Sequence, residues 1–355
     1  MSNNTLGRHF CITSFGESHG EHVGVIIDGC IPGLQLDLKY IQYELDRRKP
    51  GQSNITTSRK EDDSFRITSG IFKGITTGAP ICILIPNQNA RPNDYDHLKD
   101  VYRPSHADFT YEKKYGIRDY AGGGRSSARI TAGWVAAGAI AKMILQEKFS
   151  VDIQAYVKQI HSVSCPDSLP VSKEAIEASI VRCPDPDAAK QMIAAIESAK
   201  EQGDSLGGIV RCSIQHSPVG VGEPVFQKLQ AQLAHAMMSI NASKGVQFGS
   251  GFDSVLKKGS ELNDAWTIEN GQPKTQTNNS GGIQGGISNG MDIYFDVAFK
   301  PTATINHEQD TLNKDLEPVK LSATGRHDPC VVPRAVSIVE AMAALVMVDN
   351  LLHRL

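Results

Sequence analysis

A glycine-rich stretch followed by serines and arginines is the clearest place in this sequence where chemistry could occur. Residues 118–129 read Arg-Asp-Tyr-Ala-Gly-Gly-Gly-Arg-Ser-Ser-Ala-Arg and lead into an apolar, alanine-rich segment. Glycines leave peptide N–H groups open to a ligand. A helix N-terminus capped by Ser126 or Ser127 would add unpaired donors and a partial positive charge. With Arg125 and Arg129 alongside, the stretch predicts a site for a phosphate or carboxylate.

A glycine turn that merely enters a buried helix is the alternative interpretation, and three glycines alone would favour it. The arginines at positions 118, 125 and 129 shift the balance toward anion binding. The spacing matches neither G-x-x-x-x-G-K-[ST] nor G-x-G-x-x-G. Neither a Walker loop nor a Rossmann dinucleotide site is therefore predicted.

Two histidines lie in short segments that are typical of tight loops. His19 stands between glycines in the run 16–20, and His106 follows Arg103 and Pro104. Because an imidazole changes charge near neutral pH, either side chain could transfer a proton or stabilise an anion. A loop histidine hydrogen-bonded to its neighbours is an equally good interpretation of each motif taken alone.

Two further clusters carry charge. The run 326–329, Arg-His-Asp-Pro, would let Arg326 and Asp328 share one face of an extended chain. Spacing alone favours an ion pair there, with Asp328 as a base the alternative. The run 47–49, Arg-Arg-Lys, ends an expected helix and is typical of a solvated cluster favoured by the helix dipole.

The composition is that of a globular protein. The 355 residues are 40% hydrophobic and 21% charged, and length alone predicts about two domains. Lys+Arg at 36 against Asp+Glu at 39 gives a net charge of −3, so no basic field indicates a nucleic-acid partner. Seven scattered cysteines without a C-x-x-C pair favour reduced thiols in a cytoplasmic protein and no metal site. No signal peptide and no apolar run long enough to cross a membrane are expected.

Periodicity and turn residues predict an irregular succession of elements. Helices are expected over 38–48, 130–149, 171–180, 188–202, 226–241 and 334–352. Strands are expected over 10–14, 23–28, 67–72, 79–86, 151–160, 209–216, 249–258 and 292–299. Polar loops are expected over 52–64, 260–279 and 307–321. Without a sustained βαβ rhythm, an α+β fold is favoured over a doubly wound sheet.

Four motifs, in this order along the chain, resemble those of chorismate synthases. They are the runs 15–20, 103–108, 122–129 and 325–330, and the runs 46–48, 238–242 and 300–302 also fit. The resemblance extends over essentially the whole chain. It implies one catalytic domain over residues 1–355, a sandwich of antiparallel sheets around a helical layer. It also implies a cytoplasmic homotetramer that binds neither nucleic acid nor membrane.

The resemblance implies a reaction as well. 5-Enolpyruvylshikimate 3-phosphate would lose phosphate and a ring proton in an anti-1,4-elimination, giving chorismate at the end of the shikimate pathway for aromatic amino acid biosynthesis. Reduced FMN would be required although the reaction has no net redox change. Some members bind a pyridine nucleotide near Arg48, where a second arginine follows Pro-Gly-x-Ser. Asn54 stands at that second position here, which argues against NADPH as the flavin reductant.

Matching motifs imply roles for individual residues. His19 would protonate the reduced flavin or steady its charge, His106 would lie beside the leaving phosphate, and Asp328 would act near flavin N5. Ser18 and Ser127 would assist by hydrogen bonding. The implied FMN contacts are Arg125, Ser126, Ser127, Asn241, Ala242, Gly285, Lys300, Pro301, Thr302, Ala303 (where serine is frequent), Thr304 and Arg326, with Arg48 at the nucleotide site. The implied substrate-binding arginines are Arg47, Arg48, Arg129 and Arg334.

Two other functions remain open on the sequence. A flavin-dependent oxidoreductase acting on a phosphorylated small molecule would use the same glycine and arginine sites. An RNA-binding protein is suggested by the basic runs 47–49 and 59–60. The net charge of −3 and the 6% content of aromatic residues oppose RNA binding.

Overall fold

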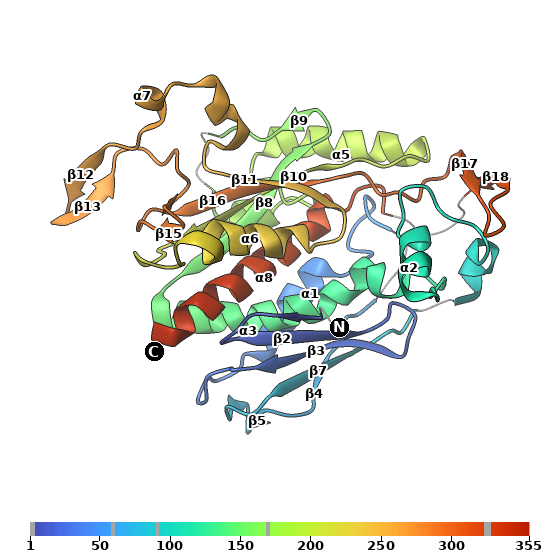
Figure 1. Ribbon diagram of the computed structural model, residues 1–355, viewed down its shortest axis with the longest axis horizontal. Coiled ribbons are helices and arrows are strands. Elements are labelled where there is room, and N and C mark those ends of the chain that lie inside the picture. Colours follow the sequence, from blue (N-terminus) through green and yellow to red (C-terminus); the bar gives the residue numbers. More distant parts are fainter. Residues whose placement is uncertain (1–3, 58–60, 90–91, 168–170, 323–327, 355) are drawn as a thin grey trace.

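Two antiparallel five-stranded sheets enclose a layer of helices in the computed structural model (Figure 1). The structure describes residues 4–57, 61–89, 92–167, 171–322 and 328–354. The strand order is β1-β2-β3-β7-β4 in the first sheet and β11-β16-β10-β8-β9 in the second. The arrangement confirms the predicted α+β sandwich of antiparallel sheets around helices.

The two sheets come from different parts of the chain. The first consists of β1 (Thr5–Leu6), β2 (Cys11–Gly16), β3 (His22–Asp28), β4 (Arg66–Ile67) and β7 (Ile81–Pro86). The second consists of β8 (Asp152–Ile160), β9 (Val163–Ser164), β10 (Gly208–Gln215), β11 (Ser243–Phe248) and β16 (Ile293–Phe299).

The helical layer consists of α1 (Leu38–Arg48), α3 (Thr131–Phe149), α6 (Leu229–Met238) and α8 (Val332–Leu351), and Figure 1 shows them between the sheets. Helices α3 and α8 pack closely because Gly138 faces Ala341, where a Cβ on residue 138 would lie 2.6 Å from the Ala341 Cα. Small residues therefore set the distance between the two central helices.

Apolar residues cover all sides of α3 and α8, as expected of helices buried on every side. Residues 128–149 and 332–354 are long and apolar enough to cross a membrane, so the expectation of no such run was wrong. In the most apolar part of each segment, 78% and 89% of the residues are buried inside the protein. Packing between two sheets accounts for this apolar character.

Helix α1 begins and ends where the sequence predicts. The Asp37 side chain accepts hydrogen bonds from the backbone N–H groups of Lys39 and Tyr40, which caps the first turn. Pro50 comes two residues after the last helical residue, Arg48, and prevents the helix from continuing. These local signals place Arg47 and Arg48 in the last turn.

Several segments differ from the prediction. The strand expected over 249–258 is a 3-10 helix, η5 (Gly251–Leu256), and the strand lies just before it as β11. The expected loop 307–321 forms a hairpin of β17 (Glu308–Leu312) and β18 (Pro318–Ser322). The expected loop 260–279 contains α7 (Gly259–Leu262), β12 (Trp266–Glu269) and β13 (Gln272–Thr275).

The remaining elements are short or peripheral. The strand expected over 67–72 is divided between β4 and β5 (Ile71–Phe72), which pairs with β6 (Ile75–Thr76), and the glycine-rich run 281–290 forms β14 (Ile283–Gln284) and β15 (Ile287–Ser288). The helix expected over 171–180 is only α4 (Lys173–Glu177), and the next is α5 (Pro186–Glu201). Helix α2 (Asp108–Tyr115) stands at one end of the sandwich (Figure 1).

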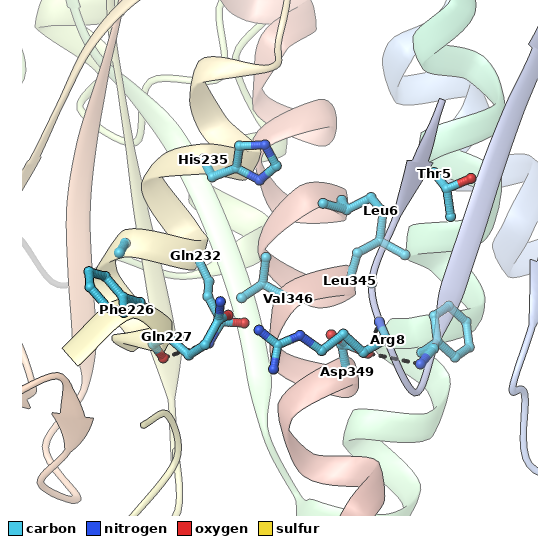
Figure 2. A pocket seen from close by; sticks show the side chains of 13 residues that line it. Thr5, Leu6, Arg8, Phe226, Gln227, Gln232, His235, Leu345, Val346 and Asp349 are labelled. Carbon is cyan, nitrogen blue, oxygen red and sulfur yellow. Dashed lines mark hydrogen bonds between the residues drawn. The ribbon is translucent and has the colours of Figure 1, made fainter. Parts of the chain in front are cut away.

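The N-terminal strands are tied to the end of α8. One oxygen of Asp349 accepts hydrogen bonds from the backbone N–H groups of Arg8, His9 and Phe10 at 2.8, 2.6 and 2.9 Å. A cavity of about 340 Å³ adjoins this contact and is lined by Arg8, Phe226, His235 and Asp349 among others (Figure 2). None of the predicted site residues lines this cavity.

Candidate functional site

The glycine turn (residues 122–124) lies between the two predicted catalytic histidines. All three glycines have positive φ angles, which side chains disfavour. A Cβ on Gly122 would overlap the His19 imidazole, and a Cβ on Gly123 would lie 3.2 Å from Cε1 and 3.5 Å from Nε2 of His106. The structure thus brings together motifs separated by about a hundred residues.

The segment after the turn prepares the start of α3. A 3-10 turn, η2 (Gly124–Ser126), is followed by a second, η3 (Ala128–Ile130), which runs into α3. Ser127 caps η3, because its Oγ accepts a hydrogen bond from the backbone N–H of Arg129 at 3.3 Å. Ser127, one of the two N-cap candidates, therefore caps the 3-10 turn before α3, whereas α3 itself begins after Ile130 without a side-chain cap.

Arg125 ties this segment to the first sheet. Its guanidinium donates to the Ser14 backbone oxygen at 3.1 Å, the Gly16 backbone oxygen at 3.1 Å and the Asn4 side-chain oxygen at 3.0 Å. Ser14 and Gly16 belong to β2, and Asn4 lies beside that strand, where its backbone oxygen accepts from the Ser14 N–H. The guanidinium therefore holds the glycine turn against the strand that leads to Ser18 and His19.

His19 has ordered surroundings. Its Nδ1 lies 3.1 Å from Oγ of the fully buried Ser18. The Tyr95 ring meets the imidazole edge-on, with the ring centroids 5.0 Å apart. Together with Gly122, these contacts fix the plane of the imidazole.

His106 lies at the entrance to α2. Its Nδ1 is 2.9 Å from the carboxylate of Asp108, the first residue of that helix. Burial opposes ionisation of Asp108, but hydrogen bonds from Arg103 and His106 outweigh burial and hold the pKa of Asp108 well below its usual range. The carboxylate beside His106 is therefore ionised.

Two predicted cofactor segments meet at the Asn241 side chain. Its Nδ2 donates to the Ser126 backbone oxygen at 2.8 Å. Its Oδ1 is buried and has no hydrogen-bond partner among the described residues. Most buried amide oxygens are paired, so this oxygen is available for a donor on a ligand. Ala242 follows with φ +67, a backbone conformation that side chains rarely adopt.

A third cofactor segment, residues 300–304, lies beside these. The Lys300 backbone N–H donates to the Ala242 oxygen at 3.0 Å, and its Nζ donates to the Ser105 oxygen at 3.1 Å. Burial, and then the neighbouring Lys244, hold the pKa of Lys300 below its usual value. Residues 302–304 are half-buried, and Pro301 is exposed.

Asp328 lies beside the segment 300–304. Its Oδ1 accepts from the Thr57 backbone N–H at 3.0 Å, and its backbone oxygen accepts from Thr302 Oγ1 at 3.0 Å. Its other carboxylate oxygen pairs with Arg334. Sequence spacing favoured an ion pair for Asp328, and the structure provides one with Arg334. Arg326, which was expected from the sequence to share a face with Asp328, lies outside the described residues.

Arg48 and Arg129 share one buried carboxylate. Asp63 accepts from Arg48 Nε at 3.0 Å and pairs through its other oxygen with Arg129. Burial lowers the pKa of Arg48 to about 10, with the neighbouring charges of Arg129 and Arg334 acting in the same direction and Asp63 opposing them. Arg334 adjoins this group, because its Nε donates to the Arg48 backbone oxygen at 3.0 Å.

Asp63 was missed in the sequence because residues 52–64 were expected to form an exposed loop. That expectation was wrong, since Ile55, Thr57 and Asp63 are all buried. Asp63 also has φ +49, so its backbone is held in an unfavourable conformation by its surroundings. An acidic residue in a polar segment carries no sequence signal for a partner that lies on another element.

Arg47 belongs to a different network from Arg48. Its guanidinium donates to Glu44 at 2.8 Å, Glu177 at 2.8 Å and Glu340 at 2.5 Å, and Lys142 Nζ joins the same group by donating to Glu340 at 2.6 Å. The interpretation of the run 47–49 as a solvated cluster was therefore wrong for Arg47 and Arg48, which are both buried. In the described part of the chain, the hydrogen bonds of the Arg47 guanidinium go to these carboxylates and not to the groups around Arg48, Arg129 and Arg334.

Gly285 also stands apart. It forms the turn between β14 and β15 with φ +63, and a Cβ there would have no atom within 4 Å. No hydrogen bond or ion pair described in the structure links it to the other predicted cofactor residues.

Comparisons with known proteins agree with these motifs. The family model described as chorismate synthase matches residues 10–352. A chorismate synthase of Synechocystis is 57% identical over 352 residues, covering 99% of this chain and 97% of that protein. One of Cytophaga hutchinsonii is 56% identical over 348 residues, covering 98% and 96%. The chloroplastic chorismate synthase 1 of Solanum lycopersicum is 55% identical over 353 residues, covering 98% and 80%.

A solved structure shares the fold. A chorismate synthase crystal structure superposes with a TM-score of 0.78 at 30% identity, covering 99% of this chain and 94% of that one. The comparisons do not favour the oxidoreductase alternative. The chain belongs to the chorismate synthase family, the flavin-dependent carbon–oxygen lyases that form chorismate in the shikimate pathway of aromatic amino acid biosynthesis.

Proposed function

We propose that this chain converts 5-enolpyruvylshikimate 3-phosphate into chorismate and phosphate with reduced FMN as its flavin. We further propose that it works in the cytoplasm as a homotetramer of single-domain chains over residues 1–355. The observation that carries the proposed reaction is the position of the glycine turn between His19 and His106. His19 packs against Gly122 and His106 against Gly123, so a phosphate bound beside the turn would be close to both imidazoles.

The residues around Asn241 fit a flavin. The unpaired Asn241 Oδ1 is an acceptor that a flavin ring N–H could satisfy. The segments 125–127, 241–242 and 300–304 would hold the cofactor, and Lys300 would face its phosphate. When bound, the reduced flavin would supply electron density to the allylic carbon from which phosphate departs. Arg326 and Gly285 stay predicted FMN contacts.

The chain's own residues would control charge and protons. His106 would donate a hydrogen bond to the departing phosphate and stabilise its charge. Asp328, held between the Thr57 N–H and Arg334, is a carboxylate that could accept a proton near the flavin. His19, oriented by Ser18, would balance charge on the flavin. Ser127 would assist by hydrogen bonding.

The four predicted substrate-binding arginines would have different roles. Arg334 pairs with Asp328 and donates to the Arg48 backbone oxygen, and we propose Arg334 and Arg48 as the contacts for substrate anions. The Arg129 guanidinium donates to Asn87 at 2.7 Å and to the Pro86 oxygen at 2.9 Å as well as pairing with Asp63. We therefore propose that Arg129 acts mainly by holding Asp63 and Arg48 in place. Arg47 would support the end of α1 from the core side.

We propose that the flavin arrives already reduced. At the position where a second arginine would help to bind NADPH, the Asn54 side chain donates to Glu197 at 2.7 Å. Lys200 Nζ also donates to the Asn54 backbone oxygen at 2.6 Å. The Asn54 side chain is thus engaged with the Glu197 carboxylate, which would repel a 2′-phosphate, and it supplies no positive charge of its own.

Exposed apolar side chains support the proposed assembly. Val255 and Leu256 on η5 are 81% and 85% exposed, and Ile268 and Trp266 on the β12–β13 hairpin are 79% and 57% exposed. A two-stranded hairpin is only marginally stable in water by itself, and this one projects from the body in Figure 1. Analytical ultracentrifugation should give the mass of four chains, and a monomer would contradict the proposal.

An anaerobic assay tests the proposed reaction. The protein is mixed with chemically reduced FMN and 5-enolpyruvylshikimate 3-phosphate, and phosphate, chorismate and flavin absorbance are followed together. We expect equal amounts of phosphate and chorismate over many turnovers, with the flavin still reduced at the end. Absence of phosphate release would rule out the proposal. Oxidation of one flavin per turnover would instead favour the oxidoreductase.

A further inference from the structure

We propose that Asp108 is a positioning residue that fixes the tautomer of His106, so that Nε2 is the nitrogen that faces the reacting phosphate. The inference rests on the proposed catalytic role of His106. Asp108 itself lies too deep to meet a substrate, with its side chain 2% exposed.

The carboxylate is held from several sides. Oδ2 accepts from the backbone N–H of Arg103 at 3.0 Å and from Arg103 Nε at 2.8 Å. Oδ1 accepts from Arg103 Nη2 at 2.7 Å and lies 2.9 Å from His106 Nδ1. Arg118 Nη1 adds a more distant charge at 3.4 Å. With so many donors the carboxylate is acceptor-only, so His106 Nδ1 must carry the hydrogen between them.

The backbone keeps the pair together. Asp108 begins α2, and its hydrogen bond from the Arg103 N–H closes residues 103–108 into a ring. Ser105 within that ring has φ +57, and Lys300 Nζ donates to its carbonyl oxygen at 3.1 Å. The ring fixes the imidazole with Nδ1 toward Asp108 and with Nε2 toward Gly123.

The charged groups around His106 and Asp108 come from three parts of the chain. Arg103 and Asp108 belong to the ring itself, Arg118 approaches from the segment after α2, and Lys300 approaches from the segment after β16. His19 lies on the far side of the glycine turn. Among the described residues, Asp108 is the carboxylate that lies within hydrogen-bond distance of His106, so it can stabilise an imidazolium that donates from Nε2.

Replacing Asp108 with Asn should invert the tautomer. The amide has one oxygen, and it would keep the two hydrogen bonds from Arg103 that Oδ2 of Asp108 accepts in the wild type. The amide NH2 would then face His106 Nδ1, which must become an acceptor, and the hydrogen moves to Nε2. An inverted imidazole cannot be protonated at Nδ1 without losing that hydrogen bond. We expect kcat to fall about 100-fold, the lower range for a positioned acid or base, while KM changes little.

The deciding measurement is ¹⁵N NMR of the full-length protein labelled at histidine, with His106→Gln used to assign the signal. At a pH high enough for a neutral imidazole, wild-type His106 should show a protonated Nδ1, and Asp108→Asn should show a protonated Nε2. Wild-type His106 with its hydrogen on Nε2 would overturn the proposal, even if the variant failed to fold. An inverted tautomer with an unchanged kcat would also overturn it.

Glu112→Gln is the matched control. Glu112 lies on the same helix and near the same Arg118, at 3.6 Å, but accepts from Tyr102 and not from His106. We expect this variant to keep the wild-type tautomer and kcat. If wild-type protein made no chorismate while its His106 tautomer agreed with expectation, the proposed function would fail and the role of Asp108 in orienting the ring would stand.

Discussion

Gly122 and His19 are in such close contact that the glycine has no room for a side chain. A Cβ on residue 122 would overlap the imidazole and lie 3.1 Å from its Nε2. The backbone at Gly122, with φ +74, would also be strained by any other residue. The position of the His19 side chain therefore depends on residue 122 having no side chain.

Gly122→Ala should displace His19 and lower activity. We expect kcat/KM to fall by at least about 10-fold, the scale of a misplaced catalytic group, with a loss of about 1–2 kcal/mol in stability from the positive φ. Gly116→Ala is the control, because Gly116 has φ +71 but no atom within 4 Å of an added Cβ. Equal losses of kcat/KM in both variants would contradict a specific contact with His19.

Asn241→Ala should weaken FMN binding, since it removes a buried oxygen that has no hydrogen-bond partner among the described residues. A lost hydrogen bond of about 1.4 kcal/mol corresponds to a tenfold higher dissociation constant. Titration of FMN followed by flavin fluorescence measures it. Gln230→Ala is the control, because Gln230 on α6 also has a buried unpaired oxygen but lies outside the predicted site. A similar change in both variants would contradict the proposed contact.

Glu340→Gln should destabilise the fold. It would leave Arg47 and Lys142 buried with one carboxylate fewer, at a cost of about 3–5 kcal/mol. Urea denaturation at neutral pH measures this free energy of unfolding. Glu147→Gln, which removes only an exposed ion pair with Lys148, should change it by less than about 1 kcal/mol. Two equally stable variants would show that the buried charge contributes nothing.

The Glu340 carboxylate should make the free energy of unfolding depend on pH. Burial opposes ionisation of Glu340, yet Arg47 and Lys142 outweigh burial and hold its pKa well below the ordinary value of 4.5. Because the folded pKa is the lower one, the stabilisation is complete above about pH 4.5 and is lost as the pH falls through the folded pKa. The free energy of unfolding, measured from pH 6 downward, should fall more steeply for wild type than for Glu340→Gln. Parallel curves would contradict this assignment.

Asp349→Ala should loosen the N-terminal strands. Three backbone N–H groups would lose their shared acceptor, and we expect a loss of about 2–3 kcal/mol. Asp28→Ala is the control, because in the described structure its carboxylate accepts one exposed hydrogen bond, from the Gly29 N–H. Both are compared by their urea midpoints. An unchanged midpoint for Asp349→Ala would show that water replaces the lost acceptor.

Local signals predicted α1 well, and they predicted much of α3 and α8. Capping by Asp37 and termination at Pro50 act within a few residues, so a sequence can reveal them. The strand β11 was missed because its identity depends on pairing with β16, which lies about fifty residues further along the chain. Hairpin β17–β18 was likewise missed in a polar segment without alternating apolar residues.

The candidate site was predicted in part. Each motif alone left its histidine or glycines ambiguous, and their order along the chain made the family resemblance specific. The partners of the arginines could not be predicted: Glu340 is 293 residues from Arg47, and Asp63 lies in a segment expected to be exposed. Burial of a charged residue is decided by distant carboxylates, which spacing does not reveal.

The last turn of α1 sends two adjacent arginines into separate networks, Arg47 to Glu340 in the core and Arg48 to Asp63 beside the site. Successive residues on a helix differ by about 100° in direction. Inserting or deleting one residue within α1 would therefore give each network the wrong neighbour and leave buried carboxylates without their cation. Length variation among natural or engineered versions of this chain should avoid α1 and fall in projecting segments such as the β12–β13 hairpin.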